Sequence, residues 1–74
     1  MKIKDSFIYN NHTALYIDTN HENVPQKISC ARIKNKEYKV LMYDKLISII
    51  GNVAIVVLID TDDSFEFEEE IVLE

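Results

Sequence analysis

The chain has 74 residues, one cysteine and a formal net charge of −5. This length has room for a single domain, residues 1–74, and the one cysteine excludes an internal disulfide. The single glycine excludes a glycine-rich phosphate loop and a dinucleotide-binding fingerprint, because both need several glycines. We therefore expect one small domain that is not an enzyme and that holds no cofactor.

The chain has no segment with the pattern of a secretory signal and no apolar run of the roughly 20 residues that span a bilayer. The N-terminal residues include lysines but lack an apolar core. A single unpaired cysteine is typical of proteins in a reducing compartment. These features predict a soluble cytoplasmic protein that has no contact with a membrane.

The charges are distributed unevenly along the chain. All eight basic residues lie between Lys2 and Lys45, so residues 1–59 have a net charge of +3. Residues 60–74 contain eight acidic residues and no basic one, which is a net charge of −8. The two parts either screen each other in the fold or present separate faces of opposite sign.

Alternating apolar and polar residues predict four strands in the first part of the chain. These strands cover residues 2–9, 13–18, 26–33 and 36–43. The apolar residues that share a face within each strand are Ile3, Phe7 and Tyr9; Leu15 and Ile17; Ile28 and Cys30; and Tyr38, Val40 and Met42. Turns are predicted at residues 10–12 and 34–36, because asparagine tolerates positive φ.

The stretch from Leu46 to Leu58 is almost wholly apolar, with Gly51-Asn52 inside it. Glycine at the first of two central positions suits a type II′ hairpin turn, which predicts two paired strands. The second of them, residues 53–59, is apolar on both faces and is expected to be covered on both sides. Residues 44–50 suit either a strand or one helical turn.

The C-terminal part is predicted to be a further strand. Its alternation places Phe65, Phe67, Ile71 and Leu73 inward and Glu66, Glu68 and Glu70 outward. Glu69 breaks the alternation, which predicts a bulge or a chain break there. About six short strands with little or no helix indicate an all-β fold, a small closed or partly open antiparallel barrel.

Three patterns with catalytic or metal-binding residues match known sites poorly. His12, His21 and Cys30 have the spacing of no closed zinc site. Cys30 lies within a predicted strand, whereas reactive thiols occupy exposed electropositive positions. Residues 60–64 begin like a calcium-binding loop, but Phe65 stands where glycine is needed and the bidentate glutamate is missing. We expect no metal site and no catalytic residue.

Two surfaces are candidates for binding a partner. Glu66, Glu68 and Glu70 form an acidic face that suits a basic protein, although glutamates on an edge strand also simply prevent aggregation. The basic segment, residues 27–45, is the alternative. Small barrels bind single-stranded nucleic acid in cationic grooves that contain stacking aromatic residues. This segment has residues of both kinds: Arg32, Lys34, Lys36, Tyr38 and Lys39. The acidic overall charge disfavours this alternative, because such affinity depends on neutralising phosphates.

Three stretches resemble the second, β-barrel domain of elongation factor Tu: ARIKNKEYKVL (31–41), GNVAIVVLID (51–60) and EIVL (70–73). The resemblance covers residues 28–73 and implies a closed barrel of about six strands. The family's glycine-rich first hairpin, its Gly-Asp turn and its GTPase domain are absent. That barrel contacts the aminoacyl end of tRNA or other factor surfaces, but no residue of such a site can be carried over to this chain.

Together these observations favour a non-catalytic protein-binding module. Its partner would be a basic protein bound to the acidic C-terminal face, or a second copy of the chain bound through an exposed apolar edge. The alternative function is a barrel that contacts single-stranded nucleic acid or tRNA through the basic segment.

Overall fold

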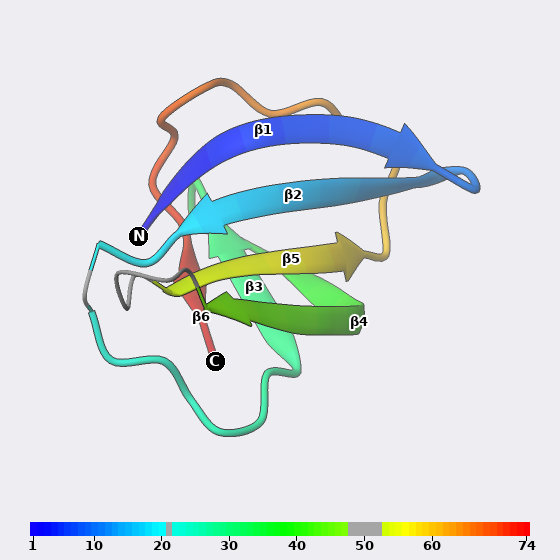
Figure 1. Ribbon diagram of the computed structural model, residues 1–74. Helices are drawn as coiled ribbons and strands as arrows, with labels where there is room; N and C mark the ends of the chain where they lie inside the picture. The colour runs from blue at the N-terminus through cyan, green and yellow to red at the C-terminus, as the bar shows by residue number, and fades with distance from the viewer. Residues whose placement is uncertain (21, 48–52) are drawn as a thin grey trace.

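The computed structural model describes residues 1–20, 22–47 and 53–74. These residues form six strands and no helix (Figure 1). The strands are β1 (Lys2–Tyr9), β2 (His12–Asp18), β3 (Cys30–Ile33), β4 (Lys36–Ile47), β5 (Val53–Ile59) and β6 (Val72–Leu73). They pair antiparallel in the order β1-β2-β5-β4-β3-β6. The prediction of an all-β fold with about six strands is confirmed.

The sheet curls into a partly open barrel because β4 pairs with two different strands along its length. Its residues 36–39 pair with β3, and its residues from Val40 to Ile47 pair with β5. At the other edge, the start of β1 meets the segment before β6 through the bridge between Lys2 and Glu70 and the hydrogen bond from the Ile3 amide to the Glu69 carbonyl. The rest of β1 has no such partner among the described residues, so the sheet does not close.

Two-residue turns connect the strands of both hairpins that the structure describes. Asn10 and Asn11 join β1 to β2 with φ angles of 52° and 64°, and Lys34 and Asn35 join β3 to β4 with φ angles of 51° and 65°. Positive φ at both central residues is the type I′ requirement, which matches the twist of the flanking strands. Both predicted turns are confirmed, except that His12 already belongs to β2 and Lys36 to β4.

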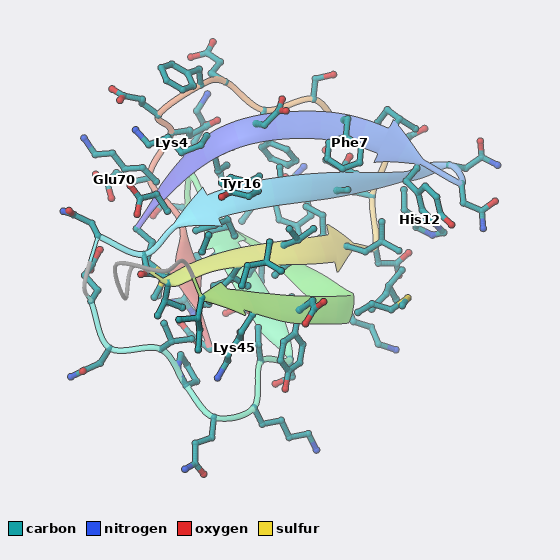
Figure 2. All side chains as sticks on the ribbon, viewed as in Figure 1. Lys4, Phe7, His12, Tyr16, Lys45 and Glu70 are labelled. Atoms are coloured by element: carbon teal, nitrogen blue, oxygen red, sulfur yellow. The ribbon has the colours of Figure 1, made fainter. Side chains whose placement is uncertain are left out.

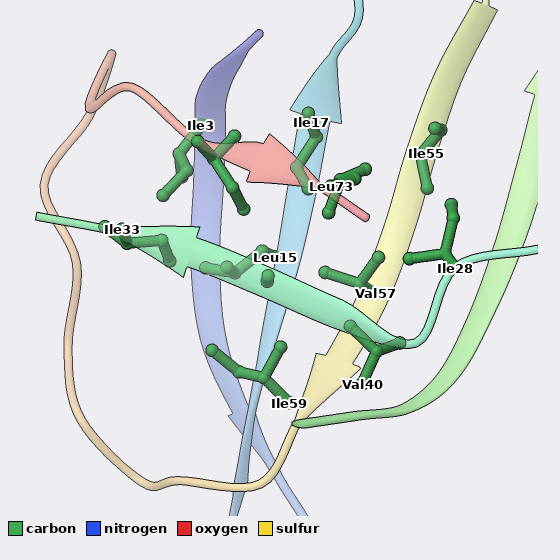
Figure 3. Close-up of a cluster of buried hydrophobic side chains, with 12 residues drawn as sticks. Ile3, Leu15, Ile17, Ile28, Ile33, Val40, Ile55, Val57, Ile59 and Leu73 are labelled. Atoms are coloured by element: carbon green, nitrogen blue, oxygen red, sulfur yellow. The ribbon is translucent and has the colours of Figure 1, made fainter. Parts of the chain in front are cut away.

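Aliphatic side chains fill the space between the inner face of the sheet and the crossing strands β3 and β6 (Figure 3). The buried cluster is Ile3, Leu15, Ile17, Ile28, Ala31, Ile33, Val40, Ile55, Val57, Ile59, Ile71 and Leu73. Each large aliphatic side chain that is fully buried contributes about 1.5–3 kcal/mol. This packed cluster stabilises the fold without a disulfide.

Two β-bulges reverse the predicted direction of several apolar side chains. The register of β1 shifts directly after Ile3, which is buried, so that Phe7 and Tyr9 are exposed on the outside. The register of β4 shifts directly after Val40, which is buried, and leaves Met42 67% exposed. The predicted shared face of Ile3 with Phe7 and Tyr9 is therefore wrong, and so is that of Val40 with Met42, because a bulge adds one residue and changes the side on which later residues lie.

The predicted strand 26–33 is shorter than expected and faces the other way. Only Cys30–Ile33 forms a strand, and its buried residues are Ala31 and Ile33. The backbone before it is irregular, because the amides of both Ser29 and Cys30 donate to the carbonyl of Glu74. Ile28 is buried from this irregular segment, so the predicted common face of Ile28 and Cys30 is wrong.

The C-terminal part is mostly irregular, and only Val72–Leu73 is a strand. A turn at residues 67–68, with φ of 66° at Glu68, interrupts the predicted strand next to the expected break at Glu69. Ile71 and Leu73 are buried as predicted, but Phe67 is 69% exposed. Residues 44–47 belong to a strand, whereas the predicted Gly51-Asn52 hairpin lies outside the described residues.

Candidate interaction surface

Strand β5 is apolar on both faces, but only one face is fully covered. On the inner side Ile55, Val57 and Ile59 have no exposed surface. On the outer side the side chains are only partly buried: Ala54, Val56 and Leu58. The expectation that this strand is covered on both sides is therefore wrong, since β3 and β6 cross only the inner face (Figure 3).

The outward side chains of β1, β2, β5 and β4 form three cross-strand rows, which we call the outer face. The first row is Phe7, Ala14, Leu58 and Met42. The second row is Asp5, Tyr16, Val56 and Asp44. The third row is Lys2, Asp18, Ala54 and Leu46. Figure 2 shows Phe7 and Tyr16 on β1 and β2, which belong to the first and second rows.

The first row is apolar on all four strands, from β1 to β4. Phe7 is 48% exposed, and Ala14 beside it is buried by its larger neighbours. The residues of this row line a shallow hollow of about 240 Å³ together with Tyr9, Tyr43, Asp44 and Val56. Exposed apolar side chains that gather on one face in this way are typical of a site that binds a partner.

Two carboxylates mark the ends of the second row. Asp5 on β1 and Asp44 on β4 are both exposed, and no lysine or arginine of the described residues forms a salt bridge with either. Adjacent strands lie about 4.8 Å apart, so the backbones that carry these carboxylates are about 14 Å apart. The apolar centre of the outer face thus lies between two acidic groups.

The predicted acidic face is exposed but partly neutralised. Glu66, Glu68 and Glu70 are all exposed on the segment that precedes β6. Lys4 donates to Glu68 across 2.9 Å, and this contact lowers the pKa of Glu68. Glu70 Oε2 lies 3.9 Å from the amino group of Met1. Lys4 and Glu70 are labelled at the same end of the molecule in Figure 2. The opposite charges of the two halves therefore screen each other here.

Glu69 has a nearly buried side chain that helps to hold the fold together. In the sequence, the only sign of this role is that Glu69 breaks the alternation of apolar and acidic residues. Its side chain is 8% exposed, with Lys34 Nζ 3.0 Å from Oε1 and the Glu66 amide donating to Oε2. Burial alone would raise the pKa of Glu69, but the Lys34 ammonium and the Glu66 amide outweigh it and lower the pKa. This buried carboxylate anchors the acidic segment to the β3–β4 turn.

The basic residues of the alternative binding face are only partly available. Arg32 contacts Glu37 at 2.6 Å and Glu74 at 3.0 Å, and these carboxylates raise its pKa. Lys34 is paired with Glu69, while Lys39 is exposed. Two of the predicted phosphate-binding groups therefore already have acidic partners within the chain.

The aromatic residue of that alternative face packs against the protein itself. The Tyr38 ring meets the Phe65 ring edge-on, with 5.5 Å between centroids, and is partly buried against the core cluster. Lys36 Nζ lies 6.0 Å from the centroid of the same Tyr38 ring. A nucleic-acid base would have to compete with these contacts in order to stack on Tyr38.

The structure does not bring the histidine and cysteine candidates together. His12 interacts with Asp60 at 3.6 Å, Cys30 is partly buried in β3, and His21 lies outside the described residues. The described residues contain no group of three or more His, Cys, Asp or Glu side chains placed to hold a metal ion. Residues 60–64 are an irregular connection.

Comparison of the chain with protein-family models, with curated proteins and with solved structures gives no match. The resemblance to the second domain of elongation factor Tu therefore stays a prediction. In the part of the chain that the structure describes, no helix is long and apolar enough to cross a membrane.

Proposed function

We propose that this chain is a non-catalytic protein-binding module and that it binds its partner through the outer face of the sheet. The observation that supports this most directly is the first row, where Phe7 and Met42 keep about half or more of their surface exposed. Burying apolar surface of this kind is the main driving force of most protein association. We place the module in the cytoplasm, since its single free cysteine suits a reducing compartment.

The acidic C-terminal face remains a second binding surface within the same proposal. Glu66 and Glu70 are exposed there, and a basic partner would gain from both. Glu68 contributes less, because Lys4 already occupies its carboxylate. Exposed charge pairs contribute about 0–1 kcal/mol each, so this face acts best in addition to an apolar contact.

Site-specific photo-crosslinking in the cells that make this protein tests the proposal. A photoreactive phenylalanine analogue at Tyr16 reports on the outer face, and the same analogue at Glu66 or Arg32 reports on the acidic and basic surfaces. We expect a discrete protein adduct from Tyr16 that disappears when Met42→Asp is added. Adducts from position 66 alone would move the site to the acidic face, and nucleic-acid adducts from position 32 alone would favour the alternative function.

A further inference from the structure

We propose that the element which binds the outer face is an amphipathic α-helix whose apolar stripe is bordered by lysine or arginine on both sides. This inference rests on the proposed function, because it names the chemistry of the partner for the same surface. Three properties of the outer face support it: its width, its length and the placement of its charges.

The width suits one helix. The apolar residues Tyr16 and Val56 lie side by side in the middle of the second row, and Asp5 and Asp44 lie outside them. The two acidic residues are separated by three strand spacings, or about 14 Å. A helix with its side chains is about 10–12 Å across, so a helix that follows β2 and β5 fits between the two carboxylates.

The length suits a short helix. Successive rows are two residues apart along β2 and β5, which is about 6.7 Å for each step. Three rows therefore extend over about 13 Å, or roughly two and a half helical turns. The partner needs apolar residues at positions i, i+3, i+4 and i+7 to follow this strip.

The charges favour a cationic partner over a second copy of the chain. The first two rows contain Asp5 and Asp44 and no basic residue, while in the third row Lys2 lies opposite Asp18. Two copies stacked with their second rows facing each other would bring the carboxylates of one row onto those of the other. A helix with basic borders instead places a positive charge at each end of the second row, where flexible lysine stems reach the carboxylates.

Three synthetic 18-residue peptides of leucine with lysine or glutamate test this chemistry. The first has a leucine stripe bordered by lysine, the second has the same stripe bordered by glutamate, and the third has the composition of the first in scrambled order. Fluorescence anisotropy measures affinity, and amide NMR shifts locate the contact. We expect the lysine-bordered peptide to bind at least about tenfold more tightly than the other two, which corresponds to about 1.4 kcal/mol. Its shifts should lie on β2 and β5.

A matched pair of double variants separates specific from general electrostatic attraction. Asp5→Asn with Asp44→Asn removes two charges from the outer face, and Glu66→Gln with Glu70→Gln removes two charges elsewhere. We expect the first pair to weaken the lysine-bordered peptide about three- to tenfold and the second pair to weaken it less than twofold. Equal losses from both pairs would overturn the inference, because they would show attraction to net charge alone.

The remaining outcomes distinguish this inference from the proposed function. Equal binding of the lysine- and glutamate-bordered peptides on β2 and β5 would overturn the partner chemistry and leave the outer face as a binding site. A cross-link from Tyr16 to a second copy of the chain would also overturn the partner chemistry and leave the outer face as a binding site. So would a result in which no peptide shifts the amide signals of β2 or β5 while Tyr16 still cross-links a partner. No cross-link from Tyr16 in cells would instead remove the outer face as the binding site of the proposed function, and this inference would fall with it.

Discussion

Strands β2 and β5 carry large apolar side chains on both faces, but only the side chains of the inner face are fully buried. On β5, Val57 points inward and has no exposed surface, while its neighbour Val56 points outward and stays partly exposed. On β2, Leu15 is buried and the larger Tyr16 beside it is 38% exposed. The inner face is covered by β3 and β6, and the outer face is not (Figure 3). Apolar side chains on a strand thus do not by themselves define a core, because burial also requires another element that covers the face.

The largest expected difference in stability between the two faces comes from replacing valine by alanine at two adjacent positions of β5. Val57→Ala removes two buried carbon atoms and leaves a cavity, so we expect it to lower the free energy of unfolding by about 2–3 kcal/mol. Val56→Ala changes a side chain that is partly in water already, and we expect less than about 1 kcal/mol. Urea denaturation followed by circular dichroism measures both. Equal losses would mean that the outer face is as well packed as the inner one.

A second pair of substitutions compares the two phenylalanines that the sequence assigned to one inward face. Phe65 is partly buried and packs edge-on against Tyr38, so Phe65→Ala should lower the free energy of unfolding by about 1–2 kcal/mol. Phe67 is exposed, with Lys4 Nζ 5.2 Å from its ring centroid, so Phe67→Ala should cost about 0.5 kcal/mol. Thermal unfolding of both variants measures the difference. A larger loss from Phe67→Ala would place that ring in the core.

The smallest expected effect concerns the ion pairs that join the two oppositely charged parts of the chain. Folding lowers the pKa of Glu68 and of Glu69 below their ordinary value of 4.5. Their contribution is therefore fully present above about pH 4.5 and is lost as the pH falls through the lower values of the folded chain. The urea midpoint should decrease between pH 5 and pH 3. The double variant Glu68→Gln, Glu69→Gln should show a smaller decrease, and an identical decrease would contradict this assignment.

Local patterns in the sequence predicted the strands and the turns well. Residues 13–18 alternate in the structure as expected, since β2 runs without a bulge on this stretch. The two predicted asparagine turns form because asparagine is among the few residues that adopt positive φ at low cost. These strands and turns depend mainly on residues that are neighbours in the chain, so they can be predicted from the sequence.

The direction of Phe7 and Met42 could not be predicted in this way. Each follows a bulge, and a bulge depends on the register with the partner strand, which no local pattern reveals. The ion pair of Lys4 with Glu68 was equally hidden, because 64 residues separate the two in sequence. The acidic segment was found as a charge pattern, but its neutralisation required the contact between the two ends of the chain.

The all-β class follows from local features of the chain, because period-two alternation, β-branched residues and asparagine turns leave few other ways to bury its apolar residues. Which of these apolar residues form the core depends on how the strands pack in the folded chain. Burial depends on what covers a face, and β3 and β6 cover just one side of the sheet. The outer face, with its apolar first row between Phe7 and Met42 and its carboxylates at Asp5 and Asp44, became a candidate site for that reason.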